Sequence, residues 1–231
     1  METRRGWLRG LALPVAIAAL ALGLPAAAAG VPEHCCKRLA KVAAPDAPLS
    51  VSGHWITDAR GRVVILHGLN MVYKRPPYQP RAVGFGADDA AFLRRNGFNT
   101  VRLGLIYKRV QPHPEGYDVP YIRGIRSTER MLARHRIFSL LDFHQDLYNE
   151  KFAGEGFPDW AVLDDGLPAE PLTGFPATYV SSPGLNRAFD NLWANATGPG
   201  GVPIQDQYAS AWARVALAFK GDPGVMGYDL L

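Results

Sequence analysis

The stretch Ile137-Phe-Ser-Leu-Leu-Asp-Phe-His-Gln-Asp146 decides the predicted fold, because in it an apolar run breaks abruptly into polar side chains. The run Ile137–Leu141 has the length and composition of a buried strand, and Asp142, His144 and Asp146 follow it. A buried strand that ends in polar groups is typical of a parallel α/β sheet, which presents its chemistry at the carboxyl edge of its strands. The sequence therefore places a candidate site directly after this strand.

The same alternation of strand and helix recurs along residues 49–231. A β-hairpin comes first: Leu49–Ile56 alternates, Asp58–Gly61 supplies a turn, and 62–66 returns. The returning strand continues to polar residues at 67–74. Further strands are predicted at 98–106, 137–143 and 225–231, with helices opening at Asp88 and Pro120 and covering 208–219.

Such alternation requires parallel pairing through right-handed crossovers. We therefore predict an α/β fold consisting of the N-terminal half, about four β/α units, of a (β/α)8 TIM barrel preceded by a β-hairpin. A whole barrel of this kind needs about 250 residues. A long segment, roughly 145–181, lacks a clear periodicity, and such segments are usually functional or disordered.

The first residues have the pattern of an export signal. Arg4, Arg5 and Arg9 precede an apolar run, Leu11–Leu24, and the small residues of Pro25–Gly30 form a cleavage site. The run is too short for a membrane span. A twin-arginine signal and an ordinary signal both fit this pattern. We therefore expect a secreted protein organised as signal peptide 1–29, linker 30–48 and domain 49–231.

The charge distribution argues against nucleic acid as a partner, and the cysteines argue against a stabilising disulfide. The net charge is +4 at pH 7, yet no run of five or six like charges occurs, so nucleic acid is not an expected partner. Cys35 and Cys36 are adjacent, and a bridge between them would close almost no loop. No cofactor, no resident metal and no stable membrane span is expected.

Four segments together resemble family-5 glycoside hydrolases, and more narrowly their endoglycoceramidase-like branch. They are Gly61–Pro77, Gly97–Leu103, Leu141–Asp146 with Gly156–Trp160, and Gly227–Leu231. The resemblance implies a retaining β-glycosidase on a TIM barrel, with a nucleophile and an acid/base glutamate about 5–5.5 Å apart. In that family the acid/base follows an asparagine after the fourth strand, and the nucleophile ends the seventh. Both are thus expected beyond Leu231, so that this chain alone would be a half-barrel without catalytic residues and inactive.

The resemblance also suggests roles for residues that are present. Arg102 lies in an otherwise apolar strand, where a guanidinium needs a carboxylate partner. By resemblance it supports catalysis by orienting the nucleophile, and a structural ion pair is the alternative. His144 and Asp146 point to the same side by strand alternation and, by resemblance, bind hydroxyls of the sugar being cleaved. Lys74 adds a third contact, unless it is simply solvated.

The following loop leaves two interpretations open. Trp160, with Phe152, Phe157 and Tyr148, either forms an apolar wall for a sugar face or lipid, or anchors the loop to the barrel rim. Asp142 is expected to accept hydrogen bonds from nearby loop amides. The expected substrate is a glycoside or glycolipid, with transient contact to the lipid.

Two other functions compete with a glycosidase. A metal-dependent hydrolase would use His67, His144 and Asp146, although no closely spaced third ligand is evident. A non-catalytic carbohydrate- or lipid-binding module would be built from the half-barrel. Asp146 with Glu150 or Glu155 would be an alternative carboxylate pair, whose separation the sequence does not fix.

Overall fold

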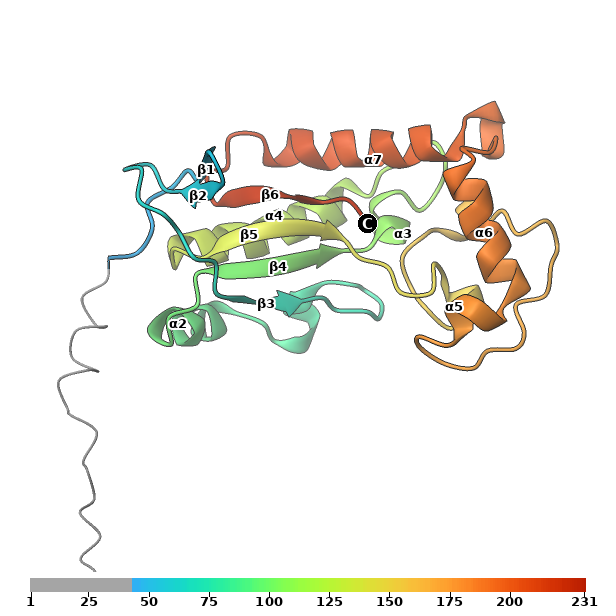
Figure 1. Ribbon diagram of the computed structural model, residues 1–231, viewed down its shortest axis with the longest axis horizontal. Coiled ribbons are helices and arrows are strands. Elements are labelled where there is room, and N and C mark those ends of the chain that lie inside the picture. The colour runs from blue at the N-terminus through green and yellow to red at the C-terminus, as the bar shows by residue number, and fades with distance from the viewer. Residues whose placement is uncertain (1–42) are drawn as a thin grey trace, which may run out of the picture. The chain divides into compact units, whose positions relative to one another are not determined.

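A parallel sheet in the order β3-β4-β5-β6 is the centre of the computed structural model, which describes residues 43–231 (Figure 1). Its strands are β3 (Gly68–Met71), β4 (Thr100–Leu105), β5 (Phe138–Phe143) and β6 (Val225–Asp229). All three neighbouring pairs are parallel. The predicted α/β fold with a parallel sheet is therefore confirmed. Closure into an eight-stranded barrel stays a prediction, because the described residues supply four strands of this sheet.

Helices form each crossover, as the alternating pattern predicts. They are α2 (Ala87–Arg95) before β4, α3 (Tyr107–Val110) and α4 (Val119–Arg134) before β5, and α5 (Thr178–Ser181), α6 (Pro183–Trp193) and α7 (Ile204–Phe219) before β6. Short 3-10 turns lie at Pro80–Val83, Glu150–Phe152, Asp159–Ala161 and Pro199–Gly201. No helix among residues 43–231 is long and apolar enough to cross a membrane.

Helix α4 forms where its sequence signals predict. The Asp118 carboxylate accepts from the Tyr121 backbone N–H at 2.9 Å and caps the helix, and a proline occupies its first turn. Tyr121, Ile125 and Leu132 lie on its buried face. That face packs against β5 and α7.

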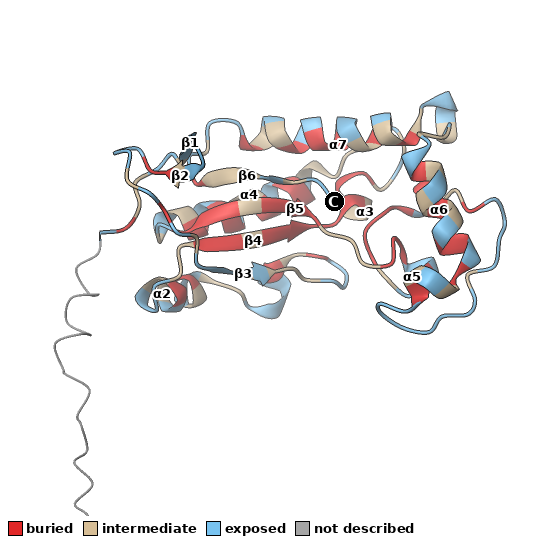
Figure 2. Ribbon diagram, viewed as in Figure 1, coloured by how far each residue is buried: buried red, intermediate tan, exposed pale blue. Residues whose placement is uncertain are grey.

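The two faces of β4 and β5 differ in chemistry. Val101, Leu103 and Leu105 are fully buried, as are Leu141 and Phe143 (Figure 2). Phe143 stacks on Trp212 of α7 with ring centroids 3.9 Å apart, so this face is the one that the helices cover. Because side chains alternate along a strand, the residues between them face the other side of the sheet. That side carries the polar groups.

The hairpin differs in detail from its prediction. Leu49–Ile56 is not one strand: it bends at Gly53, whose φ of 57° suits glycine, and makes β1 (Ser50–Ser52) and β2 (Trp55–Thr57). The Asp58–Gly61 turn is present, with its backbone hydrogen bond from Gly61 N–H to Asp58 O at 2.8 Å. The returning segment meets β2 only through a bridge between Thr57 and Val63.

The segment 145–181 is ordered by its own contacts. Phe152, Phe157 and Tyr148 are buried, and the Asn149 side-chain amide donates to Phe157 O at 2.7 Å. These contacts match the alternative in which the aromatic residues anchor the loop.

The helices also differ in part from the predictions. Helices α3, α5 and α6 are additional to those predicted, and α7 begins at Ile204 rather than at Tyr208. Trp212 and Phe219 of α7 lie in the core.

The predicted signal peptide 1–29, the linker up to residue 42 and the Cys35–Cys36 pair lie outside the described residues. The end of the predicted linker contacts the hairpin: Ala44 is buried, and Asp46 pairs with Arg60 at 2.6 Å.

Candidate active site

A row of charged side chains crosses the polar face of the sheet near the carboxyl ends of the strands. In register, Arg102 of β4 lies opposite Leu140 of β5, and Gly104 lies opposite Asp142. Asp142 in turn lies opposite Asp229 of β6. Arg102 and Asp142 thus come from adjacent strands one step apart along the same face, and Asp229 extends the row to a third strand.

Arg102 connects the row through three contacts. Its Nη2 donates to Asp142 Oδ1 at 2.9 Å, and its Nε donates to Asp229 Oδ2 at 2.7 Å. Its Nη1 lies 3.2 Å from His144 Nδ1. The carboxylate partner that the sequence requires for this guanidinium is therefore present, and there are two of them. An arginine bridging two carboxylates forms strong, charge-assisted hydrogen bonds that fix its orientation.

Asp142 is the buried centre of this network. Its side chain has no solvent exposure, and its Oδ2 lies 3.0 Å from His144 Nδ1. It accepts from a guanidinium and an imidazole, so the expectation that it binds loop amides is wrong. The partners of the carboxylate are side chains because strand alternation points it across the sheet face rather than toward the loop.

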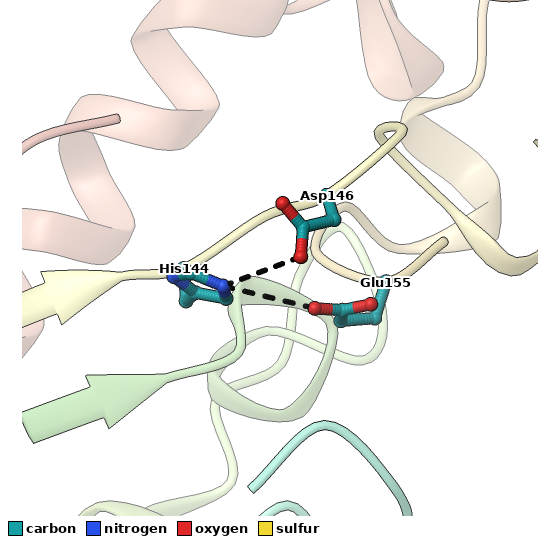
Figure 3. A group of neighbouring side chains, drawn as sticks. All are labelled: His144, Asp146 and Glu155. Atoms are coloured by element: carbon teal, nitrogen blue, oxygen red, sulfur yellow. Dashed lines mark ion pairs between the residues drawn. The ribbon is translucent and has the colours of Figure 1, made fainter. Parts of the chain in front are cut away.

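The network leaves one nitrogen of His144 free to face the site. Nδ1 is occupied by Asp142 and Arg102, whereas Nε2 points toward Asp146 Oδ2 at 3.6 Å and Glu155 Oε1 at 3.8 Å (Figure 3). Both separations exceed hydrogen-bonding distance. Nε2 is buried and has no hydrogen-bond partner among the described residues.

Lys74 brings a positive charge to the same place. Its ammonium forms an ion pair with Asp146 Oδ2 and lies 3.4 Å from Glu155 Oε1. Burial alone lowers the pKa of Lys74, but the hydrogen bond to Asp146 and the charges of both carboxylates together raise it above its ordinary value. Lys74 is therefore a cation at neutral pH. Its side chain is 45% exposed, so the ion pairs are partly screened.

Glu155 reaches the site because the loop folds back on itself. Asp146 and Glu155 exchange both backbone hydrogen bonds, at 2.9 and 2.8 Å, as in an antiparallel bridge. Flanking glycines permit this approach: a Cβ on Gly154 would lie 1.8 Å from Asp146 O, and one on Gly156 would lie 2.4 Å from Gln145 Cβ. Gly156 also has a φ of 141°, which L side chains rarely adopt.

Burial raises the pKa of the Glu155 carboxyl, and the Lys74 charge only partly opposes that effect. The side chain is 9% exposed, and its Oε1 atom is buried without a hydrogen-bond partner among the described residues. The carboxyl group is therefore poorly solvated where it faces the imidazole.

The structure brings four of the five predicted site residues together. Lys74, Arg102, His144 and Asp146 form one connected group. Trp160 is the exception: its indole N–H donates to Gln111 O at 3.2 Å, and its ring packs edge-on against Tyr107. These contacts match the anchoring alternative for Trp160, and sugar contact by it stays a prediction.

Two site residues were not among those predicted. Asp229 lies 127 residues after Arg102, and only the strand order shows that they meet. The sequence offers Glu155 only as a possible partner of Asp146 in an alternative carboxylate pair. The Gly-Glu-Gly sequence at 154–156 is the signal that this part of the loop packs closely against the backbone at Asp146.

The proposed metal hydrolase site with His67 is wrong as composed. His67 stacks on Phe98 with ring centroids 4.2 Å apart, and it precedes β3 at the opposite end of the sheet from His144. A different group, His144, Asp146 and Glu155, has potential ligand atoms within 4.8 Å of one another. Lys74 already places a cation against both carboxylates of that group.

A parallel α/β sheet with a polar carboxyl edge is the arrangement of TIM-barrel glycosidases, and comparison with known proteins agrees. The solved structure of endo-glycoceramidase II from Rhodococcus sp. superposes with a TM-score of 0.66 at 34% identity, over 75% of this chain and 40% of that chain. Cryptococcus neoformans sterylglucosidase 1, at 18% identity and a TM-score of 0.56, shows similarity of fold alone.

Curated sequences give the more specific relationship. An endoglycoceramidase of Hydra vulgaris is 34% identical over 202 residues, and endoglycoceramidase I of Rhodococcus hoagii is 36% identical over 189 residues. The alignments cover 76% and 82% of this chain. The chain is therefore an endoglycoceramidase-like sequence.

It spans 38% and 37% of the length of these relatives. No family model matches the chain.

Proposed function

We propose that this chain supplies the sugar-binding part of a secreted, retaining family-5 β-glycosidase that cleaves glycosphingolipids. The observation that carries the proposal is the network in which Arg102 and Asp142 hold His144, so that its Nε2 faces Asp146 and Glu155, the two carboxylates that Lys74 also contacts. Imidazole, ammonium and carboxylate groups are the donors and acceptors that bind sugar hydroxyls.

Similarity supports the substrate class. The relatives named above are endoglycoceramidases, and another structure of the Rhodococcus enzyme is a complex with ganglioside GM3, superposing with a TM-score of 0.68 at 32% identity. A glycolipid substrate implies transient contact with a lipid surface, and export through the predicted signal peptide would bring the protein to it.

We propose that Asp146 and Glu155 do not form the catalytic pair. Asp146 forms an ion pair with Lys74, and Glu155 Oε1 lies 3.4 Å from the same ammonium, so both carboxylates are engaged by that cation. Glu150 lies elsewhere, accepting from Tyr78 Oη at 2.5 Å and pairing with Lys108 at 3.0 Å. In this proposal the catalytic glutamates are residues other than these, and Arg102 is a positioning residue that orients the nucleophile.

Two measurements test the proposal. Purified chain is first incubated with ganglioside GM3 and with cellobiose, and we expect no hydrolysis. Binding of cellobiose is then followed by saturation-transfer NMR, where we expect a signal from the intact chain. Hydrolysis by this chain alone would contradict the assignment of the catalytic residues, and absence of glycoside binding would contradict the sugar-binding role.

A non-catalytic carbohydrate-binding module is the second candidate, because the same polar group binds sugar without any catalytic glutamate. It predicts that a chimera of this chain with the C-terminal part of a relative's barrel would not hydrolyse GM3. The glycosidase proposal predicts that a chimera completed with the C-terminal part of the Rhodococcus enzyme would hydrolyse GM3.

A further inference from the structure

Two buried polar atoms of the site face each other without a partner. They are His144 Nε2 and Glu155 Oε1, which lie 3.8 Å apart. Glu155 comes from the loop and His144 from the end of β5, and Figure 3 shows both the Glu155 and Asp146 carboxylates facing the same side of the imidazole. Buried groups without partners are uncommon, and each one costs free energy in the empty protein.

A direct hydrogen bond between the two atoms is absent because of their separation, whatever the protonation of the imidazole. With its proton on Nδ1, donated to Asp142, His144 presents a bare Nε2 that faces carboxylate oxygens, which can only accept. With a proton on Nε2, the donor is still 3.6 and 3.8 Å from Asp146 and Glu155. A bridging group that both donates and accepts would satisfy either state.

A hydroxyl group has this property, since it offers one donor and two acceptor lone pairs. A hydroxyl oxygen can lie at about 2.8 Å from both atoms if it sits to one side of the line that joins them. Lys74 Nζ, 3.4 Å from Glu155 Oε1, is placed to donate to the same or a neighbouring hydroxyl. The arrangement suits adjacent hydroxyls of a sugar ring.

A metal ion fits the space less well. The three potential ligands lie close enough together, but the Lys74 ammonium contacts the two carboxylates that would have to bind the metal. A divalent cation would have to displace that ammonium against charge repulsion.

We propose that Glu155 is a substrate-binding residue, whose Oε1 accepts a hydrogen bond from a hydroxyl of the bound sugar that also bonds to His144 Nε2. This inference rests on the proposed function and adds Glu155 to the predicted contacts of Lys74, His144 and Asp146. Specificity follows, because a sugar lacking that hydroxyl leaves both buried atoms without partners.

The test compares Glu155→Gln with Glu150→Gln. The control changes the same residue type in the same loop, at a carboxylate bonded to Tyr78 and Lys108. Cellobiose binding to the intact chain is measured by NMR titration, with the His144 ring nitrogens followed by nitrogen-15 shifts. We expect Glu155→Gln to weaken binding about tenfold, because the hydroxyl then donates to a neutral amide oxygen instead of a charged carboxylate, and Glu150→Gln to bind as the unsubstituted chain does.

The outcomes are distinguishable. If the unsubstituted chain binds cellobiose, and Glu155→Gln binds equally and shows the same shift of Nε2, the role of Glu155 is refuted while the proposed function stands. If the unsubstituted chain binds no glycoside, the proposed function fails and the inference fails with it. Stoichiometric zinc binding that shifts Nε2 and is lost in Glu155→Gln would show a metal site and overturn the inference.

Discussion

Replacing Asp142 with asparagine tests whether the buried carboxylate holds the site together. The side chain is fully buried, and each of its oxygens has one partner: Arg102 Nη2 at 2.9 Å and His144 Nδ1 at 3.0 Å. Asparagine has nearly the same shape but keeps only one acceptor, so its amide N–H groups must face either the guanidinium or the imidazole.

The magnitude follows from these contacts. A hydrogen bond to a charged group contributes about 1.5–3 kcal/mol, and breaking a buried ion pair costs about 3–5 kcal/mol. Arg102 is 26% exposed and keeps Asp229, which reduces the loss. We therefore expect Asp142→Asn to lower the free energy of unfolding by about 2–3 kcal/mol, or Tm by about 5–10 °C for a domain of this size.

Urea unfolding monitored by tryptophan fluorescence measures the change. Asp165→Asn is the matched control, since Asp165 pairs with Arg187 but is 54% exposed, and such pairs contribute less than about 1 kcal/mol. Asp142→Asn should also weaken cellobiose binding, because His144 loses its orientation. A stability within about 0.5 kcal/mol of the unsubstituted chain would refute the claim that Asp142 organises the row.

Three further predictions concern the loop, a buried acid and the core. Gly154→Ala should destabilise by about 1–3 kcal/mol in thermal melts, because its Cβ would meet Asp146 O at 1.8 Å; Gly116→Ala, with its nearest atom at 3.9 Å, should not. Burial and the Asp222 charge raise the pKa of Glu129 to about 7, above its unfolded value. The folded state therefore keeps the Glu129 proton to a higher pH than the unfolded state does, and the free energy of unfolding should fall as pH rises from about 4.5 to 7. In urea titrations at pH 5 to 8, Glu129→Gln should remove that fall, and an unchanged pH dependence would contradict the assignment. Ile125→Ala, at a fully buried position, should cost about 2–5 kcal/mol in the same assay, and a cost below about 1 kcal/mol would mean that α4 is not packed as described.

The sequence predicts the sheet well because local patterns determine it. The apolar runs of β4 and β5 are as short as strands and are followed by polar residues. The proline in the first turn of α4 marks the start of that helix. The hairpin was less predictable, because the bend at Gly53 depends on a single backbone angle inside an alternating run. Helix α6 carries readable signals that the prediction missed: Ser182 caps it, a proline opens it, and Leu185, Ala188 and Leu192 recur at helical spacing on its buried face.

The site residues that lie in or directly after a strand could be predicted from the sequence. Those that a later strand or a returning loop brings to the site could not. Arg102 stands in β4, where alternation determines the direction of its side chain, and His144 and Asp146 follow directly after β5. Asp229 required the strand order, and Glu155 required the return of the loop to Asp146. Trp160 illustrates the reverse, since an aromatic residue near a site is equally suited to packing, and its partners Tyr107 and Gln111 are distant in sequence.

The charged row on the sheet also has a consequence for folding fidelity. Strand β6 is only half buried, so apolar contacts specify its alignment weakly, and its ladder with β5 contains an irregularity at Ser139 and Leu140. Shifting β6 by one residue would turn Asp229 to the other face and leave Arg102 without its second carboxylate. The Arg102–Asp229 ion pair thus disfavours misaligned strands, because a chain with β6 out of register would leave the Arg102 guanidinium without one of its two carboxylate partners.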